Sequence, residues 1–305
     1  MRIVLAIGGN ALLQSGDDGT VESQSARAIA SLTHVLPLLV SREKLLLTHG
    51  NGPQVGNALL RAEAGIPQTP HRPLDYLVSD TQGGIGYLLE RTLRNLIKKN
   101  GGKREVLTML AQVRVKSTDP SFDTPSKPVG PWFDSFEKEN LESKGWVLTE
   151  TEKGVRRLVP SPKPKEVIEV EIIRSLFENR MLCITAGGGG TPVIHDSDEW
   201  KGVEGVIDKD LVSSLLASEL NASHLIIATD VDNVWVGQNR EPIRSITVSK
   251  LHKHHEEGEF PVGSMGPKVL AALNFVKSKN QTAIITSLSK VMQALDGKAG
   301  TIITR

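Results

Sequence analysis

The sequence has a single cysteine, Cys183, so no disulfide can form within the chain. This cysteine lies in the apolar segment MLCIT, where a buried structural side chain is expected rather than a reactive thiol. An excess of charge of one sign is also lacking, because 36 lysines and arginines stand against 35 aspartates and glutamates. That balance gives no electrostatic footprint for a nucleic acid or an anionic membrane, so any anion site must be local.

Long hydrophobic runs are absent, since no apolar stretch approaches the roughly 18 to 20 residues that span a bilayer. The opening segment MRIVLAIGGNALL breaks at Gly8 and Gly9 without a small-residue cleavage pattern, and it is predicted to be a first strand. With 305 residues the chain can bury a full core as one large domain or two moderate ones. We therefore expect a soluble cytoplasmic protein with no membrane or nucleic-acid partner.

Short β-rich apolar runs alternate with longer helical patterns, which predicts parallel strands joined by helical crossovers in an α/β fold. Strands are expected at residues 2–7, 44–49, 104–110, 181–186, 224–229, 282–286 and 301–304. Helices are expected at residues 21–42, 53–64, 76–99, 166–179, 208–220 and 267–279. This order is typical of an open, doubly wound sheet.

Residues 117–164 depart from the alternation of strands and helices, because this region is rich in proline. The prolines lie near its two ends, in the segments DPSFDTPSKPVGPWF and VPSPKPK. Between these segments, GWVLTE and GVRRLVP have the pattern of the two arms of a hairpin. An insertion of this kind is usually peripheral, and its functional form is a lid or a substrate arm.

Three of the predicted strands end in glycine-rich turns. The turns consist of Gly8, Gly9 and Asn10; of Gly50, Asn51 and Gly52; and of residues 187–190. In open α/β sheets ligands bind beyond the carboxyl ends of the strands, and glycine lets backbone N–H groups approach an anion. The turns predict a phosphate or carboxylate site, although neither the dinucleotide fingerprint nor the Walker A pattern is met.

The segment GVIDKDL places Asp208, Lys209 and Asp210 where an apolar-periodic helix begins. Helix capping is one interpretation, because acidic side chains complement the free N–H groups and the dipole of a first turn. Lys209 opposes that dipole, as does Lys268 at the glycine-preceded helix start GSMGPK. A bound polyphosphate would account for both lysines, and Asp210 could then hold their ammonium groups. Both interpretations remain open at this point.

Seven segments together resemble the carbamate kinases, which have the amino acid kinase fold. They are IVLAIGGNAL, LLLTHGNGPQVG, LDYLVSDTQGGIGY, KPVGPW, GGGGTPV, GVEGVIDKDL and GSMGPKV. The resemblance extends from residue 3 to the terminal GTIIT, and it implies a homodimer of open αβα sandwiches, each with a central, mostly parallel sheet. It also implies an N-terminal lobe at 1–195 for carbamate or carbamoyl phosphate, with a small protruding subdomain at about 117–164. The implied C-terminal lobe, 196–305, binds the adenine nucleotide.

The implied reaction is reversible phosphoryl transfer between ATP and carbamate, giving ADP and carbamoyl phosphate, with Mg²⁺ carried by the nucleotide and no metal site of the protein's own. The implied catalytic residues are Lys209, Lys268, Asp210, Lys127 and Asn10. The implied substrate-binding residues are Gly8, Gly9, Gly50, Asn51, Gly52 and Lys127. The implied nucleotide-binding residues are Asp230, Val231, Met265, Gly266, Pro267 and Lys268.

The residue types suit this chemistry, because a carbamate oxygen is already anionic and needs no general base. A sibling kinase of the same fold acting on another small carboxylate is the nearest alternative. A nicotinamide-dependent dehydrogenase is disfavoured by the missing fingerprint, and a catalytically silent regulator by the lysines and Asp210. In LHKHHEEGEF we expect a solvated helix face rather than a metal site, and for His49 a structural hydrogen bond.

Overall fold

All seven predicted strands belong to one eight-stranded sheet in the computed structural model, which describes residues 1–13, 17–237, 241–261 and 263–305. The strand order is β15-β17-β16-β12-β1-β2-β9-β3, and neighbours run parallel except at β16–β17. The strands are β1 (Arg2–Ile7), β2 (Lys44–His49), β3 (Val106–Met109), β9 (Leu182–Thr185), β12 (His224–Thr229), β15 (Ser245–Thr247), β16 (Thr282–Ser287) and β17 (Thr301–Thr304). The predicted mostly parallel α/β sheet is confirmed.

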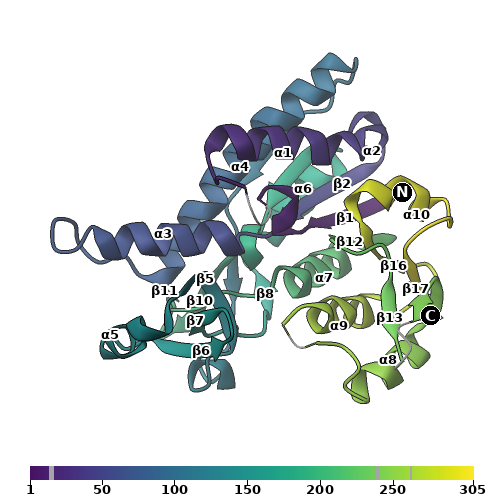
Figure 1. The fold of residues 1–305 in the computed structure, drawn as a ribbon. Coiled ribbons are helices and arrows are strands. Elements are labelled where there is room, and N and C mark those ends of the chain that lie inside the picture. Colours follow the sequence, from purple (N-terminus) through teal and green to yellow (C-terminus); the bar gives the residue numbers. More distant parts are fainter. Residues whose placement is uncertain (14–16, 238–240, 262) are drawn as a thin grey trace.

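Helices cover both faces of this sheet, as Figure 1 shows. One face packs against α1 (Val21–Thr33), α2 (Leu36–Val40), α4 (Leu74–Lys99) and α10 (Val291–Leu295). The other packs against α6 (Val170–Glu178), α7 (Lys209–Glu219), α8 (Val248–Glu256) and α9 (Met265–Phe275). Successive side chains of a strand enter opposite cores, as with Ile3 and Val4 of β1, which explains the continuous apolar runs. None of the helices in the described ranges is both long and apolar enough to cross a membrane.

A small subdomain protrudes beside α3 (Gly52–Ala64) (Figure 1). Its sheet has the order β5-β7-β6, formed by β5 (Lys127–Phe133), β6 (Val147–Thr151) and β7 (Gly154–Val159), and α5 (Lys138–Ser143) lies beside it. The predicted hairpin is confirmed, since β6 and β7 pair antiparallel. Val129, Trp146 and Val155 of the subdomain share a core with Val55 and Leu59 of α3, so the base of the subdomain is packed rather than loosely tethered.

Several predicted boundaries were wrong. The helix expected at 21–42 is divided into α1 and α2, because Pro37 lacks the N–H that a helix interior needs and opens the second helix instead. The helix expected at 166–179 begins at Val170, because Glu166–Val167 forms strand β8 beside β4 (Gln112–Arg114). The helix expected at 267–279 ends at Phe275, where Val276 has an extended backbone.

Short strands outside the main sheet were missed, because they are brief and half polar and give no clear period. They include β10 (Thr191–Asp196) and β11 (Glu199–Gly202), which complete a four-stranded sheet, and the pair β13 (Val234–Val236) and β14 (Glu241–Ile243).

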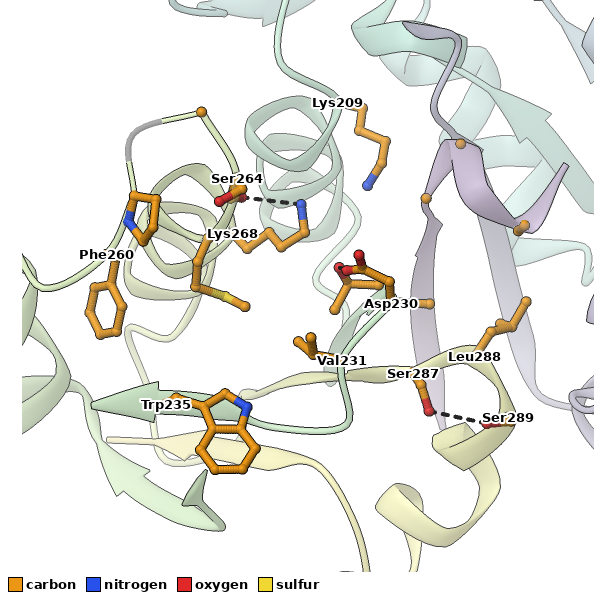
Figure 2. A pocket seen from close by; sticks show the side chains of 18 of the residues that line it. Lys209, Asp230, Val231, Trp235, Phe260, Ser264, Lys268, Ser287, Leu288 and Ser289 are labelled. Carbon is orange, nitrogen blue, oxygen red and sulfur yellow. Dashed lines mark hydrogen bonds between the residues drawn. The ribbon is translucent and has the colours of Figure 1, made fainter. Parts of the chain in front are cut away.

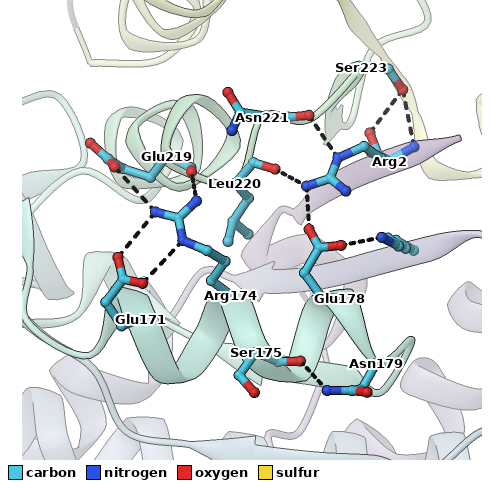
Figure 3. Close-up of polar contacts among 11 residues, drawn as sticks. Arg2, Glu171, Arg174, Ser175, Glu178, Asn179, Glu219, Leu220, Asn221 and Ser223 are labelled. Atoms are coloured by element: carbon cyan, nitrogen blue, oxygen red, sulfur yellow. Dashed lines mark hydrogen bonds and ion pairs between the residues drawn. The ribbon is translucent and has the colours of Figure 1, made fainter.

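At the amino end of β1, Arg2 forms hydrogen bonds that connect the sheet to α6 and to the carboxyl end of α7 (Figure 3). Its guanidinium donates to Glu178 Oε1 of α6 at 2.6 Å and to the Asn221 carbonyl beyond α7 at 2.9 Å. Lys44 of β2 also pairs with Glu178. Hydrogen bonds from Arg2 and Lys44 lower the pKa of Glu178 to about 2. Because these contacts hold α7 at its carboxyl end, the orientation of its amino end, where Lys209 lies, is also constrained.

Candidate active site

The three glycine-rich turns lie together, as predicted, because β1, β2 and β9 are adjacent and parallel in the sheet. At some of their positions the packing leaves little or no room for a side chain. A Cβ on Gly50 would lie 3.0 Å from the Gly9 nitrogen, and a Cβ on Gly188 would lie 2.1 Å from Asn51 Nδ2. Gly188 also has a φ of +65°, which an L side chain rarely adopts. Glycine is therefore required at Gly188 by contact and by conformation, and Gly50 is tightly packed against Gly9.

Asp210 joins two lysines from different helices. It lies in the first turn of α7, where its carboxylate accepts from Lys209 Nζ through Oδ1 and from Lys268 Nζ of α9 through Oδ2 at 3.1 Å. Lys268 Nζ also donates to the Ser264 carbonyl at 3.3 Å (Figure 2). Asp208 caps the helix, because its Oδ1 accepts from the Asp210 backbone N–H at 2.9 Å. The cap is therefore Asp208, whereas the Asp210 carboxylate holds the two lysines.

The charges in this cluster set one another's ionisation. Burial of Asp210, whose side chain is 3% exposed, opposes its ionisation, but the ammonium groups of Lys209 and Lys268 outweigh burial and lower its pKa. Burial also favours the neutral form of Lys268, yet the Asp210 carboxylate raises the pKa of Lys268 above its usual range. At neutral pH Asp210 is therefore an ionised carboxylate that faces the protonated Lys268.

Lys127 reaches this cluster from β5 of the protruding subdomain. Its Nζ donates to the Ile207 carbonyl at 2.8 Å and lies 3.7 Å from Asp208 Oδ2. Burial lowers the pKa of Lys127, while Asp208 and Asp210 act in the opposite direction. A third lysine thus stands at the start of α7.

A cavity of about 1140 Å³ begins at the lysines and extends over the carboxyl end of β12 (Figure 2). Among the predicted site residues, the lining includes Gly8, Gly9, Lys209, Asp230, Val231, Met265 and Lys268. Gly266 and Pro267 follow Met265 in the first turn of α9 without lining the cavity, and Gly50, Asn51, Gly52, Asp210 and Lys127 lie beyond its lining. The predicted residues therefore divide between the cavity and the glycine-rich edge next to it.

Two asparagines, Asn10 and Asn51, complete the predicted site residues of the glycine-rich turns. The backbone of Asn10 lies in the short 3₁₀ helix Gly9–Ala11, but its side chain is outside the part of the chain that the structure describes. Asn51 is buried, and its Nδ2 donates to Thr81 Oγ1 at 2.9 Å. One of its two amide N–H groups is thus used within the protein.

His49 has the structural hydrogen bond expected for it. Its Nδ1 lies 3.0 Å from the Gly50 carbonyl, and burial lowers its pKa to about 4. The ring is therefore neutral at pH 7, with Nδ1–H as the donor to that carbonyl. His49 supports the turn between β2 and α3.

The sequence reasoning missed part of the cavity wall. Its apolar end includes Trp235 and Phe260, and Ser287 ends β16 while Ser289 follows that strand (Figure 2). The rule that ligands bind beyond the carboxyl ends of parallel strands could have found the serines, since β16 is parallel to β12. Phe260 lies in a loop after α8, where no periodic signal marks it.

A second group of potential ligands includes Glu257 and Glu259 of the cavity lining. Ligand atoms of His254, Glu257 and Glu259 lie within 4.8 Å of one another. His254 Nδ1 and Glu259 Oε1 are already paired at 2.9 Å, and Glu259 also accepts from the Gly237 backbone N–H. His252, with a side chain 55% exposed, pairs with Glu256. These pairings agree with the polar, solvated helix face predicted for this segment.

Comparison with known proteins identifies close relatives along the whole chain. Residues 1–287 match the Amino acid kinase family. The carbamate kinase of Pyrococcus horikoshii is 44% identical over 310 residues, covering 99% of this chain and 99% of that protein.

Solved structures agree with these sequence matches. The carbamate kinase from Giardia lamblia bound to AMP-PNP superposes with a TM-score of 0.92 at 36% identity, covering 99% of this chain and 98% of that one. A structure of the same Giardia enzyme, thiocarbamoylated by disulfiram on a cysteine, has a TM-score of 0.90 at 37% identity with the same coverage.

Proposed function

Because the chain belongs to the amino acid kinase family and, within it, to the carbamate kinases, we propose that the Asp210-centred lysine pair is its phosphoryl-transfer site. The chain is a phosphotransferase that converts ATP and carbamate to ADP and carbamoyl phosphate, and the reverse. The observation that carries the proposal is the position of Lys209 and Lys268. Both line the nucleotide-sized cavity, and Asp210 holds both next to the glycine-rich turns.

The proposed nucleotide orientation follows from the character of the cavity. Phosphates would lie at the end with Gly8, Gly9, Lys209 and Lys268, where ammonium groups and a glycine turn favour anions. The base would lie between apolar side chains such as Val231, Trp235 and Met265, and Asp230 lies between the two ends. Gly266 and Pro267 would act through the backbone of the first turn of α9.

The acceptor would lie at the adjoining edge, formed by Gly50, Asn51 and Gly52, with Lys127 above it. Since Asn51 is buried and one of its two amide N–H groups is donated to Thr81, we expect the backbone of this turn to contact the carbamate. An in-line attack by the carbamate oxygen requires no proton acceptor. Neutral His49, bonded to the Gly50 carbonyl, fits that requirement by holding the loop rather than taking a proton.

The main electrostatic difficulty is that two anions must meet. Fixed ammonium groups reduce that repulsion and stabilise the charge on the transferred phosphoryl group. Mg²⁺ would neutralise further phosphate charge when it is carried in with ATP or ADP. Asp230 is a carboxylate of the cavity wall that fits this role, since Mg²⁺ usually binds through one or two carboxylates together with substrate phosphates.

We also propose that the two binding functions are divided between two lobes. The lobe at 1–195, with the subdomain at about 117–164, would bind the acceptor, and the lobe at 196–305 would bind the nucleotide.

The direct test is to mix the purified chain with ADP, Mg²⁺ and carbamoyl phosphate and to measure ATP formation. We expect ATP to form only when all three are present. No ATP from a folded protein that binds ADP would discard carbamate as the acceptor. A panel of other phosphorylated carboxylates, including acetylglutamyl phosphate, would then test a sibling kinase of the same fold.

We also propose that the chain forms a homodimer. Large apolar side chains are exposed on α1 and α4, including Val21 at 59%, Ile29 at 48%, Tyr76 at 60% and Tyr87 at 62%. Val21 and Tyr87 line one groove of about 780 Å³. Exposed apolar patches of this kind typically mark interaction surfaces. Light scattering on the purified protein would give its mass in solution.

We expect disulfiram to leave this protein unmodified, in contrast to the Giardia relative. Cys183 is the one cysteine of the sequence, its side chain is fully buried in β9, and burial raises the pKa of its thiol to about 12. The thiolate is the reactive form, so the folded protein should show no adduct by intact mass spectrometry and no loss of activity. The control is the same treatment in urea, which should give one adduct. An adduct on the native protein would contradict this prediction.

A further inference from the structure

The protruding subdomain rests on the rest of the molecule at a contact between two glycines. Gly56 is buried in α3, and a Cβ built on it would lie 2.2 Å from Gly130 Cα and 2.6 Å from Gly130 N. Real Cβ atoms essentially never approach backbone so closely, so any side chain at Gly56 must push β5 away from α3. Gly130 has a φ of +74°, which also favours glycine.

The backbone at this contact is held in place from the subdomain side. The pairing of β5 with β7 shifts register between Val129 and Phe133, the stretch that contains Gly130. The Gly130 carbonyl accepts from Arg156 Nε of β7 at 2.8 Å, and Val129 packs into the core shared with α3. A displacement of β5 at Gly130 would therefore be transmitted along the strand.

Lys127 lies three residues before Gly130 on the same strand. Its side chain crosses to the start of α7, where Nζ donates to the Ile207 carbonyl at 2.8 Å and faces Asp208 Oδ2 at 3.7 Å. The lysine is thus fixed at two places. The distance of its backbone from α3 is set by the contact between Gly56 and Gly130. Its Nζ is held at the start of α7.

We propose that Gly56 and Asp208 are positioning residues for Lys127. Gly56 brings β5 close enough to α3 for Lys127 to reach the phosphoryl-transfer site, and Asp208 holds the ammonium group there. The inference rests on the proposed role of Lys127 in binding the acceptor, and it adds two residues that touch neither substrate. It also gives Asp208 a role beyond capping α7.

The decisive variant is Gly56→Ala, with Gly83→Ala as the matched control. Both glycines lie inside helices, so alanine raises helix propensity at both, but a Cβ at Gly83 meets nothing within 4 Å. For Gly56→Ala we expect kcat/KM for carbamoyl phosphate to fall by about a hundredfold, because a shift of about 1 Å in a positioning group can cost that much. KM for ADP should not change, because Lys127 does not line the nucleotide cavity.

A double-mutant cycle separates positioning from general damage. In a Lys127→Ala background, Gly56→Ala should cause no further loss in kcat/KM for carbamoyl phosphate, because the group it positions is gone. The proposal would be overturned if the losses in kcat/KM of Lys127→Ala and Gly56→Ala multiply in the double variant. It would also be overturned if Gly56→Ala were as active as Gly83→Ala.

A readout independent of activity keeps this inference distinct from the proposed function. Brief acetylation followed by peptide mass spectrometry should modify Lys127 several-fold more in Gly56→Ala than in Gly83→Ala, whatever the substrate is. Asp208→Asn should have the same effect, because asparagine caps a helix as well as aspartate does but carries no charge to hold the lysine. If Gly56→Ala does not fold, the acetylation of Lys127 in Asp208→Asn tests the proposal instead. Acetylation of Lys127 that stays at the level of the unmodified protein, in whichever of these two variants folds, overturns the proposal.

Discussion

Lys209→Ala is expected to lower the turnover of ATP formation from ADP and carbamoyl phosphate by about a hundredfold to a thousandfold, the usual cost of losing one preorganised charge donor. Lys209 lies at the phosphate end of the cavity, and its side chain is only 12% exposed. The ammonium group is therefore fixed before the substrates arrive, and it requires little reorganisation during the reaction.

The variant should still fold, which makes the kinetic result interpretable. After Lys209 is removed, the buried Asp210 carboxylate keeps Lys268 as a partner at 3.1 Å, so no buried charge is left unpaired. The measurement is steady-state kinetics with ADP and carbamoyl phosphate each varied, alongside circular dichroism. Lys98→Ala, at the exposed carboxyl end of α4, is the control and should match the unmodified protein. Unchanged turnover in folded Lys209→Ala would exclude the lysine pair as the phosphoryl-transfer site.

The central sheet could be predicted from the sequence because its strands are buried on both faces. Each is a short continuous apolar run, such as RIVLAI or HLIIAT, and helical segments of a different period separate them. The parallel arrangement then places every strand end at a known edge, which explains why the three glycine-rich turns were expected together. Strands at the edge of a sheet, such as β8 and β11, lack this continuous apolar run, because one side of each strand has no neighbouring strand.

The contacts within the site depend on tertiary geometry that no local pattern encodes. Lys127 meets Ile207 and Asp208 across 80 residues of sequence, and the contact exists because β5 packs against α3 through Gly56. The sequence showed an acid–lysine–acid helix start, but either aspartate could have been the cap. The structure assigns the cap to Asp208, and this leaves the Asp210 carboxylate available for the lysines.

Asp210→Asn is expected to reduce the free energy of unfolding of the nucleotide-free protein by about 3 kcal/mol, the lower end of the cost of breaking a buried ion pair. The substitution leaves Lys209 and Lys268 facing each other with no carboxylate between them. Because the folded state lowers the pKa of Asp210, its contribution is fully present above the usual carboxyl pKa of about 3.9 and is lost as pH falls through the lowered value. Urea denaturation near neutral pH measures the full effect.

Nucleotide should reverse much of this loss. If Asp210 stands in for negative charge that phosphates later supply, then saturating ADP or ATP brings a replacement anion to the same two ammonium groups. The difference in thermal midpoint between Asp210→Asn and the unmodified protein should therefore narrow when nucleotide is added. Asp208→Asn is the matched control, because it retains the helix cap and its partner Lys127 lies outside the cavity lining. A difference that stays constant or widens with nucleotide would mean that Asp210 stabilises the fold without preparing the lysines for phosphate.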